Sequence, residues 1–281
     1  MKYVKKTIPF FDPVKVAKSG QVFRFHEIDD DHTELVAMGR YLQIASLGND
    51  EYLFSCSSDD FESIWSEYFD LDRDYLSIFD SIPEDDKYLT DSANFSYGIR
   101  ILKQEIWETV ISYIISQRRS IPSITTSVDR LSERFGTKIS LPELKAPFVK
   151  SLKEEYYAFP SVAQLSKASL QDITDTGVGY RAEYIMSAIN DFSTQKITPE
   201  LLISKNDDDL YYALISMHGV GKKVANCIML FSLARCGRFP VDVWMQRIVD
   251  KYYSGNFPVE SYPGTAGIMQ QFMFYYERNR V

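Results

Sequence analysis

Hydrophobic residues change their spacing near residue 85. Before it, short apolar runs at 21–28, 34–47 and 51–56 alternate with Asp-, Asn- and Gly-containing turns, and Gly39 divides the second run. Aromatic and β-branched residues dominate these runs, as is typical of strands joined by hairpins. We therefore expect residues 1–85 to form an antiparallel sheet domain, in which the last strand is followed by an amphipathic helix at 59–69.

From about residue 86 onward, apolar residues recur three and four positions apart, which predicts helices. Residues 105–116 are apolar over a broad face, as in a buried helix. Pro122 suits the first turn of a helix that ends before Gly136, and 264–278 predicts a C-terminal helix. The fold class is α+β, with an N-terminal antiparallel β-sheet domain (1–85) followed by an all-helical region (86–281).

Two of these predicted helices are joined by a glycine hairpin. The unit covers about 207–235, and Gly219-Val220-Gly221 separates its two helices, the second of which ends near Gly237. Two glycines allow a sharp turn and a close approach to a ligand. Free N–H groups at the start of the second helix, near Lys222, favour a phosphate.

Lysine and aspartate residues follow this hairpin at helix ends. Lys223 lies in the first turn of the second helix, one turn before Cys227 on the same face. The segment 239–243 then contains Pro240, which favours an extended chain. Asp242 occupies the N-cap position of a helix that runs to about Tyr253.

Composition narrows the function classes only partly. The chain has 281 residues, a net charge of −8 and a pI near 5.1. Acidity of the whole chain argues only weakly against a nucleic-acid partner, because binding depends on local patches. Cys56, Cys227 and Cys236 show no zinc or disulfide spacing. We expect no membrane span, no signal peptide and a reducing cytoplasm.

The hairpin at 219–224 and the Pro240-Val241-Asp242-Val243 element resemble the helix-hairpin-helix (HhH-GPD) DNA glycosylases, and within them the bacterial-type 8-oxoguanine DNA glycosylase/lyase branch. The most specific feature is Lys223 with Asp242 nineteen residues later. The resemblance spans about 10–276. It implies damaged double-stranded DNA as partner and no redox cofactor. An iron–sulfur cluster is excluded because it needs four cysteines, and a cation at the hairpin carbonyls stays an open alternative.

The resemblance implies catalytic roles for two residues. Lys223 attacks the anomeric carbon of the sugar, displaces the base and forms a Schiff base that permits strand cleavage by β-elimination. Asp242 stabilises the positive charge that develops on the sugar. The alternatives are a Lys223 that is solvated or holds a phosphate, and an Asp242 that only caps its helix.

The resemblance also implies a pocket for an extruded base. The carbonyl of Gly20 reads the N7 hydrogen that 8-oxoguanine has and guanine lacks, and Gln270 binds the Watson–Crick edge. Phe274 stacks on the base, and Cys227 is the opposite wall. As alternatives, Gly20 is a turn before a strand and Phe274 a core residue.

Further DNA contacts are implied at Arg118, Arg119, Tyr180, Arg181, Gly219, Gly221, Trp244 and Arg247. Arg118 stands where the eukaryotic branch has an asparagine that contacts the opposite cytosine, and Trp244 where it has a histidine near a phosphate. As alternatives, Arg118 grips a phosphate or is solvated, Tyr180 packs in the core and Arg181 forms a surface ion pair.

These features predict a monomeric base-excision-repair enzyme of the bacterial cytoplasm. It removes 8-oxoguanine by base flipping and cleaves the strand through the lysine Schiff base. Two alternatives stay open: a monofunctional glycosylase for alkylated bases, and a non-catalytic helix-hairpin-helix DNA-binding protein.

Overall fold

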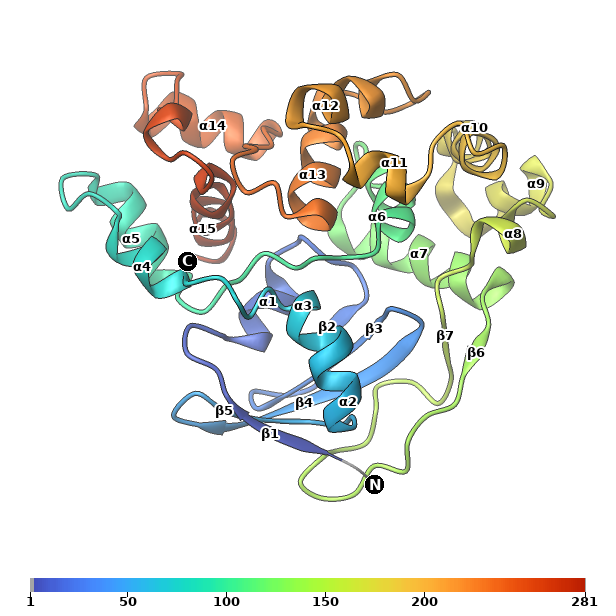
Figure 1. The fold of residues 1–281 in the computed structure, drawn as a ribbon, viewed down its shortest axis with the longest axis horizontal. Coiled ribbons are helices and arrows are strands. Elements are labelled where there is room, and N and C mark those ends of the chain that lie inside the picture. The colour runs from blue at the N-terminus through green and yellow to red at the C-terminus, as the bar shows by residue number, and fades with distance from the viewer. Residues whose placement is uncertain (1–2, 281) are drawn as a thin grey trace.

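The computed structural model describes residues 3–280, with an antiparallel sheet at one end and most of the helices gathered above it (Figure 1). The strand order in the sheet is β1-β5-β4-β3-β2. The strands are β1 (Val4–Thr7), β2 (Phe25–Glu27), β3 (His32–Ala37), β4 (Arg40–Gly48) and β5 (Glu51–Phe54). The α+β class predicted from the sequence is confirmed.

The sheet is a middle layer, covered on both faces. Leu35 and Ile44 face a helical segment through Phe61, Trp65 and their neighbours. Two smaller apolar clusters on other strand residues, Val36 and Tyr41 in one and Ala45 and Leu53 in the other, pack against the chain between 139 and 156. Burial on both faces explains why β3 and β4 lack a simple alternation of polar and apolar residues.

Helices occupy most of the remaining chain. The first six are α1 (Pro13–Lys18), α2 (Ser58–Asp60), α3 (Ser66–Tyr68), α4 (Tyr75–Asp80), α5 (Lys87–Phe95) and α6 (Ile106–Ile115). Next come α7 (Ile121–Phe135), α8 (Val162–Leu165), α9 (Leu170–Ile173), α10 (Arg181–Ser193) and α11 (Pro199–Ile203). The last are α12 (Asp207–Ile215), α13 (Lys222–Leu233), α14 (Val243–Tyr252) and α15 (Ala266–Asn279). Short π or 3-10 turns cover Phe61–Trp65, Thr174–Val178 and Val259–Ser261.

Several expectations need correction. The region after residue 86 is not all-helical, because β6 (Lys138–Ile139) pairs with β7 (Tyr156–Tyr157). The run at 21–28 forms a strand only at Phe25–Glu27, since the chain before it is tied to α6, where the Tyr113 hydroxyl donates to the Gln21 carbonyl. The helix after the hairpin ends at Leu233, where Ala234 adopts φ +49°. None of the helices within residues 3–280 is long and apolar enough to cross a membrane.

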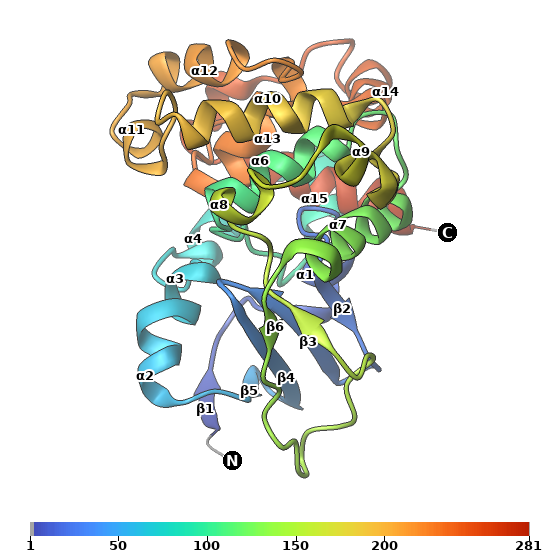
Figure 2. The same cartoon turned by 90° about the vertical axis from the view of Figure 1, so that its right-hand side faces the viewer.

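The two parts of the molecule share more than one connection. Tyr75 belongs to the larger, helical core although it precedes residue 86, and Leu102 belongs to the core of the sheet. Figure 1 shows β6 and β7 descending from the helical part, and Figure 2 shows β6 alongside the sheet. The chain therefore crosses between the two cores repeatedly.

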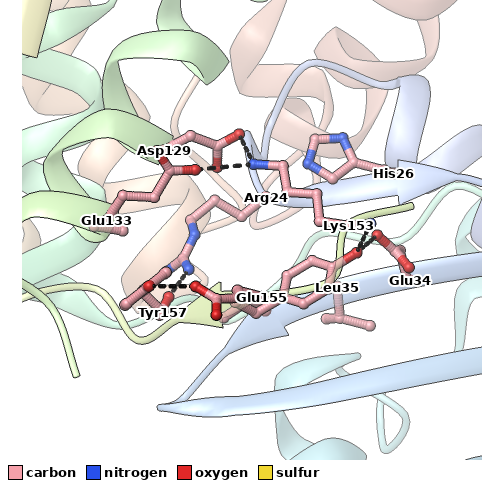
Figure 3. A pocket seen from close by; sticks show the side chains of 12 residues that line it. Arg24, His26, Glu34, Leu35, Asp129, Glu133, Lys153, Glu155 and Tyr157 are labelled. Atoms are coloured by element: carbon pink, nitrogen blue, oxygen red, sulfur yellow. Dashed lines mark hydrogen bonds and ion pairs between the residues drawn. The ribbon is translucent and has the colours of Figure 1, made fainter. Parts of the chain in front are cut away.

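A polar cluster lies at the junction between the sheet and α7 (Figure 3). Lys153 bonds to Asp129 at 2.6 Å and lies 3.6 Å from Glu133. Glu34 on β3 accepts hydrogen bonds from the backbone N–H of Leu152, at 3.1 Å, and from the hydroxyl of Tyr156. These contacts fix the 139–156 segment against the sheet, and so fix the sheet relative to α7.

Candidate active site

A cleft of about 900 Å³ opens where α13, α14 and α15 meet the loop after α6 and the loop before β2. Its lining includes seven of the residues predicted from the sequence, which come from five separate segments: Gly20, Arg118, Arg119, Lys223, Asp242, Trp244 and Phe274. The structure thus gathers into one cleft residues that are up to 254 positions apart, counting from 20 to 274.

Lys223 enters the cleft from the first turn of α13. Its ammonium nitrogen lies 5.2 Å from the ring centroid of Tyr113, a buried residue of α6. The Tyr113 ring stacks on Phe231, and its hydroxyl donates to the carbonyl of Gln21 at 3.1 Å. The lysine is therefore held over a ring that is itself fixed from two sides.

Asp242 caps α14 with one of its two carboxylate oxygens. Oδ1 accepts the backbone N–H groups of Trp244 and Met245, both at 2.9 Å. Oδ2 has no hydrogen-bond partner within residues 3–280. The cap aims the carboxylate into the cleft that Lys223 also lines, and leaves one oxygen for chemistry.

Gly20 lies in a loop whose neighbouring carbonyls are engaged. The carbonyl of Ser19 accepts from Gln271 at 2.7 Å, and the carbonyl of Gln21 accepts from Gln104 at 2.8 Å. The Gly20 carbonyl between them accepts no hydrogen bond in the described chain. Gly20 has φ +81°, and an added Cβ would lie 2.8 Å from Ile121. The positive φ requires glycine here, whereas the contact is with the end of a flexible side chain.

The predicted base-binding residues lie at different depths. Phe274 lines the cleft, whereas Gln270 and Cys227 are 5% and 2% exposed and are not among the residues that line it. The side-chain oxygen of Gln270 is buried without a partner, which is costly unless a ligand supplies a donor. Burial raises the pKa of the Cys227 thiol, although the nearby Lys223 lowers it, so the thiol stays neutral.

Two arginines predicted to contact DNA donate hydrogen bonds to other parts of the protein. Arg119 donates to Ser127 and to the carbonyl of Gly177, each at 2.9 Å. Arg181 is 7% exposed and donates to the carbonyls of Val178 and Gln117. Arg181 does not form the surface ion pair of the alternative prediction, because backbone carbonyls take its donors. Arg119 is partly exposed and also lines the cleft, so its contact with DNA stays a prediction.

The other predicted contacts remain open to solvent. Arg118 is exposed at the loop tip with φ +53°, an uncommon conformation for arginine. Tyr180 and Trp244 are 54% and 47% exposed, and the guanidinium of Arg247 lies 5.6 Å from the Trp244 ring centroid. Of these four residues, Arg118 and Trp244 line the cleft.

The two hairpin glycines differ in the space available for a side chain. A Cβ on Gly219, which has φ +84°, would lie 2.3 Å from the ring of Tyr184, whereas a Cβ on Gly221 would meet nothing within 4 Å. The Gly219 carbonyl accepts the side-chain amide of Gln117 at 3.0 Å. Gly219 is thus fixed by packing, and Gly221 presents open backbone at the start of α13.

No cluster of three or more His, Cys, Asp or Glu side chains suited to a metal occurs within residues 3–280.

Sequence reasoning missed several lining residues. Tyr113 was expected only as part of a buried helix, and Gln117 only as part of a loop. Arg278 also lines the cleft, one helical turn after Phe274. Its i+4 spacing from Phe274 was the signal available in the sequence.

The comparisons with known proteins agree with this geometry. Residues 4–110 match the N-terminal domain of 8-oxoguanine DNA glycosylase. The N-glycosylase/DNA lyase of Saccharomyces cerevisiae is 36% identical over 200 residues, which are 66% of this chain and 50% of the yeast protein. The chain therefore spans about half the length of this curated relative.

Two solved structures align from end to end. MBOgg1, in complex with a low-affinity DNA ligand, is 32% identical with a TM-score of 0.88 and covers 99% of both chains. The Clostridium acetobutylicum 8-oxoguanine glycosylase/lyase, in complex with double-stranded DNA that has cytosine opposite 8-oxoG, is 29% identical with a TM-score of 0.88. That alignment covers 99% of this chain and 98% of the other.

The sheet domain, the glycine hairpin and the cleft that holds a lysine and an aspartate define a helix-hairpin-helix protein of the HhH-GPD superfamily. Within that superfamily, the chain belongs to the 8-oxoguanine DNA glycosylase family.

Proposed function

We propose that this protein is a bifunctional DNA glycosylase and lyase that removes 8-oxoguanine from duplex DNA. The observation that carries the proposal is the meeting of Lys223 and Asp242, from two different helices, in one cleft with Gly20 and Phe274. An amine and a carboxylate beside a flat apolar wall suit the cleavage of a bond between a purine and a sugar. The N-glycosylase/DNA lyase activity named for the yeast relative supports the assignment.

The chemistry requires one nucleophile and one stabilising charge. The Lys223 amine forms a bond to C1′ of the flipped nucleotide while the C1′–N9 bond breaks and its electron pair leaves with the base. The free oxygen of Asp242 stabilises the positive charge on the sugar. Loss of a proton from C2′ of the resulting Schiff base then expels the 3′ phosphate by β-elimination, which cuts the strand.

Recognition of the base rests on unsatisfied polar atoms near the cleft. The free carbonyl of Gly20 accepts the N7 hydrogen of 8-oxoguanine. With guanine, it would face a lone pair instead, which is unfavourable in a desolvated site. The buried oxygen of Gln270, which has no partner within residues 3–280, accepts a donor from the Watson–Crick edge. Phe274 supplies the stacking surface.

The protein is further proposed to be a bacterial-type member of the family that acts as a monomer in the cytoplasm. The end-to-end alignment with the Clostridium acetobutylicum enzyme supports the bacterial type. Three unpaired cysteines fit a reducing compartment. Light scattering of the purified protein, alone and with DNA, measures its oligomeric state and so tests whether it is a monomer.

Trapping with borohydride tests the activity. A duplex with one 8-oxoguanine opposite cytosine is incubated with the wild type, Lys223→Gln or Lys222→Gln, and borohydride then reduces any Schiff base to a stable adduct. Lys222 is the matched control, because it is an exposed lysine in the same turn of α13 and carries the same charge. We expect an adduct with the wild type and Lys222→Gln and none with Lys223→Gln.

The other outcomes distinguish the alternatives. Base release without an adduct, unchanged in Lys223→Gln, would identify a monofunctional glycosylase. Neither adduct nor base release, with equal binding to damaged and undamaged duplex, would identify a non-catalytic DNA-binding protein.

A further inference from the structure

Arg278 lines the cleft without a hydrogen-bond or ion-pair partner among residues 3–280. Arg278 lies one turn beyond Phe274 and two turns beyond Gln270 on one face of α15. Within residues 3–280 it forms no hydrogen bond and no ion pair, whereas its neighbour Arg280 pairs with Glu277 at 2.6 Å. A guanidinium carries five N–H donors, so those of Arg278 are available to a ligand in the cleft.

Arg278 converges with two residues of the proposed base pocket. Its central guanidinium carbon lies 5.2 Å from the ring centroid of Phe274. A Cβ built on Gly20 would lie 3.0 Å from Nη1 of Arg278 and 3.3 Å from Cε1 of Phe274. The donors of Arg278 therefore lie where a base between Gly20 and Phe274 would present its edge.

The chemistry of a guanidinium limits what it recognises there. It offers donors only, so it requires an acceptor on the ligand. In 8-oxoguanine, C8 carries a carbonyl oxygen next to the N7 hydrogen, whereas C8 of guanine carries only hydrogen. Burial in the cleft lowers the pKa of Arg278 and Asp242 raises it, so the group keeps its charge at neutral pH.

We propose that Arg278 donates a hydrogen bond to the C8 carbonyl oxygen of the flipped 8-oxoguanine and stabilises the base as it leaves. This inference rests on the proposed function. As Lys223 bonds to C1′ and the C1′–N9 bond breaks, the electron pair passes to the purine, and its negative charge spreads onto the C8 oxygen. A base that stacks on Phe274 displaces the guanidinium from the ring and meets its N–H groups at the edge.

Binding to two uncleavable nucleotides tests this contact. The first is 2′-fluorinated 8-oxoguanine nucleotide, whose fluorine suppresses cleavage; the second is 9-deazaguanine, which keeps an N7 hydrogen but has no oxygen on C8. We expect the wild type to bind the first duplex about tenfold more tightly, as one charge-assisted hydrogen bond provides. In Arg278→Met, this preference falls to within about twofold.

Two further measurements complete the experiment. A duplex with a tetrahydrofuran abasic site has no base, so Arg278→Met should bind it within about threefold of the wild type. Single-turnover release of 8-oxoguanine should slow at least tenfold in Arg278→Met and recover partly in Arg278→Lys, which keeps the charge. Folding of each variant is checked by thermal unfolding, and Arg278→Met loses no hydrogen bond within the described chain.

Several results would overturn the proposal. An unchanged preference in Arg278→Met would show that the arginine does not read the C8 oxygen. An equal loss of affinity for the abasic duplex would make Arg278 a contact to the DNA backbone instead. If the wild type releases no 8-oxoguanine, the proposed function itself fails, whereas release by the wild type with an unchanged preference refutes only the role of Arg278.

Discussion

Two substitutions of Asp242 can separate its role as a helix cap from the role of its negative charge. Its Oδ1 atom accepts the N–H groups of Trp244 and Met245 at the start of α14, while Oδ2 is free for the reaction. Asparagine caps helices about as well as aspartate but carries no charge, whereas alanine does neither. Asp242→Asn and Asp242→Ala therefore remove the two contributions in different combinations.

The expected magnitudes differ for stability and for rate. Asp242→Asn loses only the interaction of the charge with the helix dipole, about 0.5 kcal/mol. Asp242→Ala also loses the cap, for a total of about 1.5 kcal/mol and a fall in Tm of about 3–6 °C in a chain of this size. Both variants lose the stabilisation of the sugar cation, which slows single-turnover base release by about 100- to 1,000-fold.

Urea unfolding and single-turnover kinetics on one 8-oxoguanine duplex measure the two effects in the same preparations. A release rate for Asp242→Asn within threefold of the wild type would refute the catalytic role and leave Asp242 as a cap. Equal destabilisation by Asn and Ala would refute the cap energetics instead.

Three further predictions follow from the structure. Gly219→Ala should lose at least about 2 kcal/mol in urea unfolding, because its Cβ would lie 2.3 Å from the Tyr184 ring at φ +84°. Gly221→Ala should lose only about 0.5–1 kcal/mol, because its Cβ would meet nothing within 4 Å and it loses only a favourable N-cap residue; equal effects would contradict the packing argument. Burial raises the pKa of Glu108 to about 7, so the folded state retains a proton that the unfolded chain releases near pH 4.5. Stability should therefore fall by about 3 kcal/mol as the pH rises from 4.5 through 7, and this fall should vanish in Glu108→Gln when urea unfolding is repeated across that range. Gln270→Met removes a buried oxygen that has no partner within residues 3–280, so it should raise the free energy of unfolding by about 1 kcal/mol, and with it Tm, while slowing base release. A loss of stability would mean that the oxygen is satisfied in the free protein.

Local elements of the site were predictable because neighbouring residues determine them. The hairpin, the lysine in the first turn of α13 and the cap at Asp242 all depend on contacts within a few positions of the chain. The hairpins of the sheet were predictable for the same reason, since turn residues and alternating runs define them. Strand β1 was missed because it is short and carries two lysines, and only its pairing with β5 makes it a strand.

The arginines show what sequence reasoning does not reach. Arg119 and Arg181 were both predicted to contact DNA, and the fold also gives both of them backbone carbonyls of neighbouring loops as acceptors. Arg278 drew no prediction, yet it lines the cleft and its donors have no acceptor within residues 3–280. An arginine's donors go to whichever acceptors the fold brings within reach, and those acceptors lie far away in the sequence.

The sequence by itself determined most of the helices and strands, the family, and the choice of Lys223 and Asp242 as candidate catalytic residues. Helix caps, turns and periodicity depend on residues close together in the chain. Only the tertiary structure decided the base pocket. Gly20 meets Phe274 and Arg278 across more than 250 residues, through a loop held by Tyr113 and Gln271. The physical reason is that packing and the pairing of buried polar groups operate through space, so which donors remain free is a property of the whole fold.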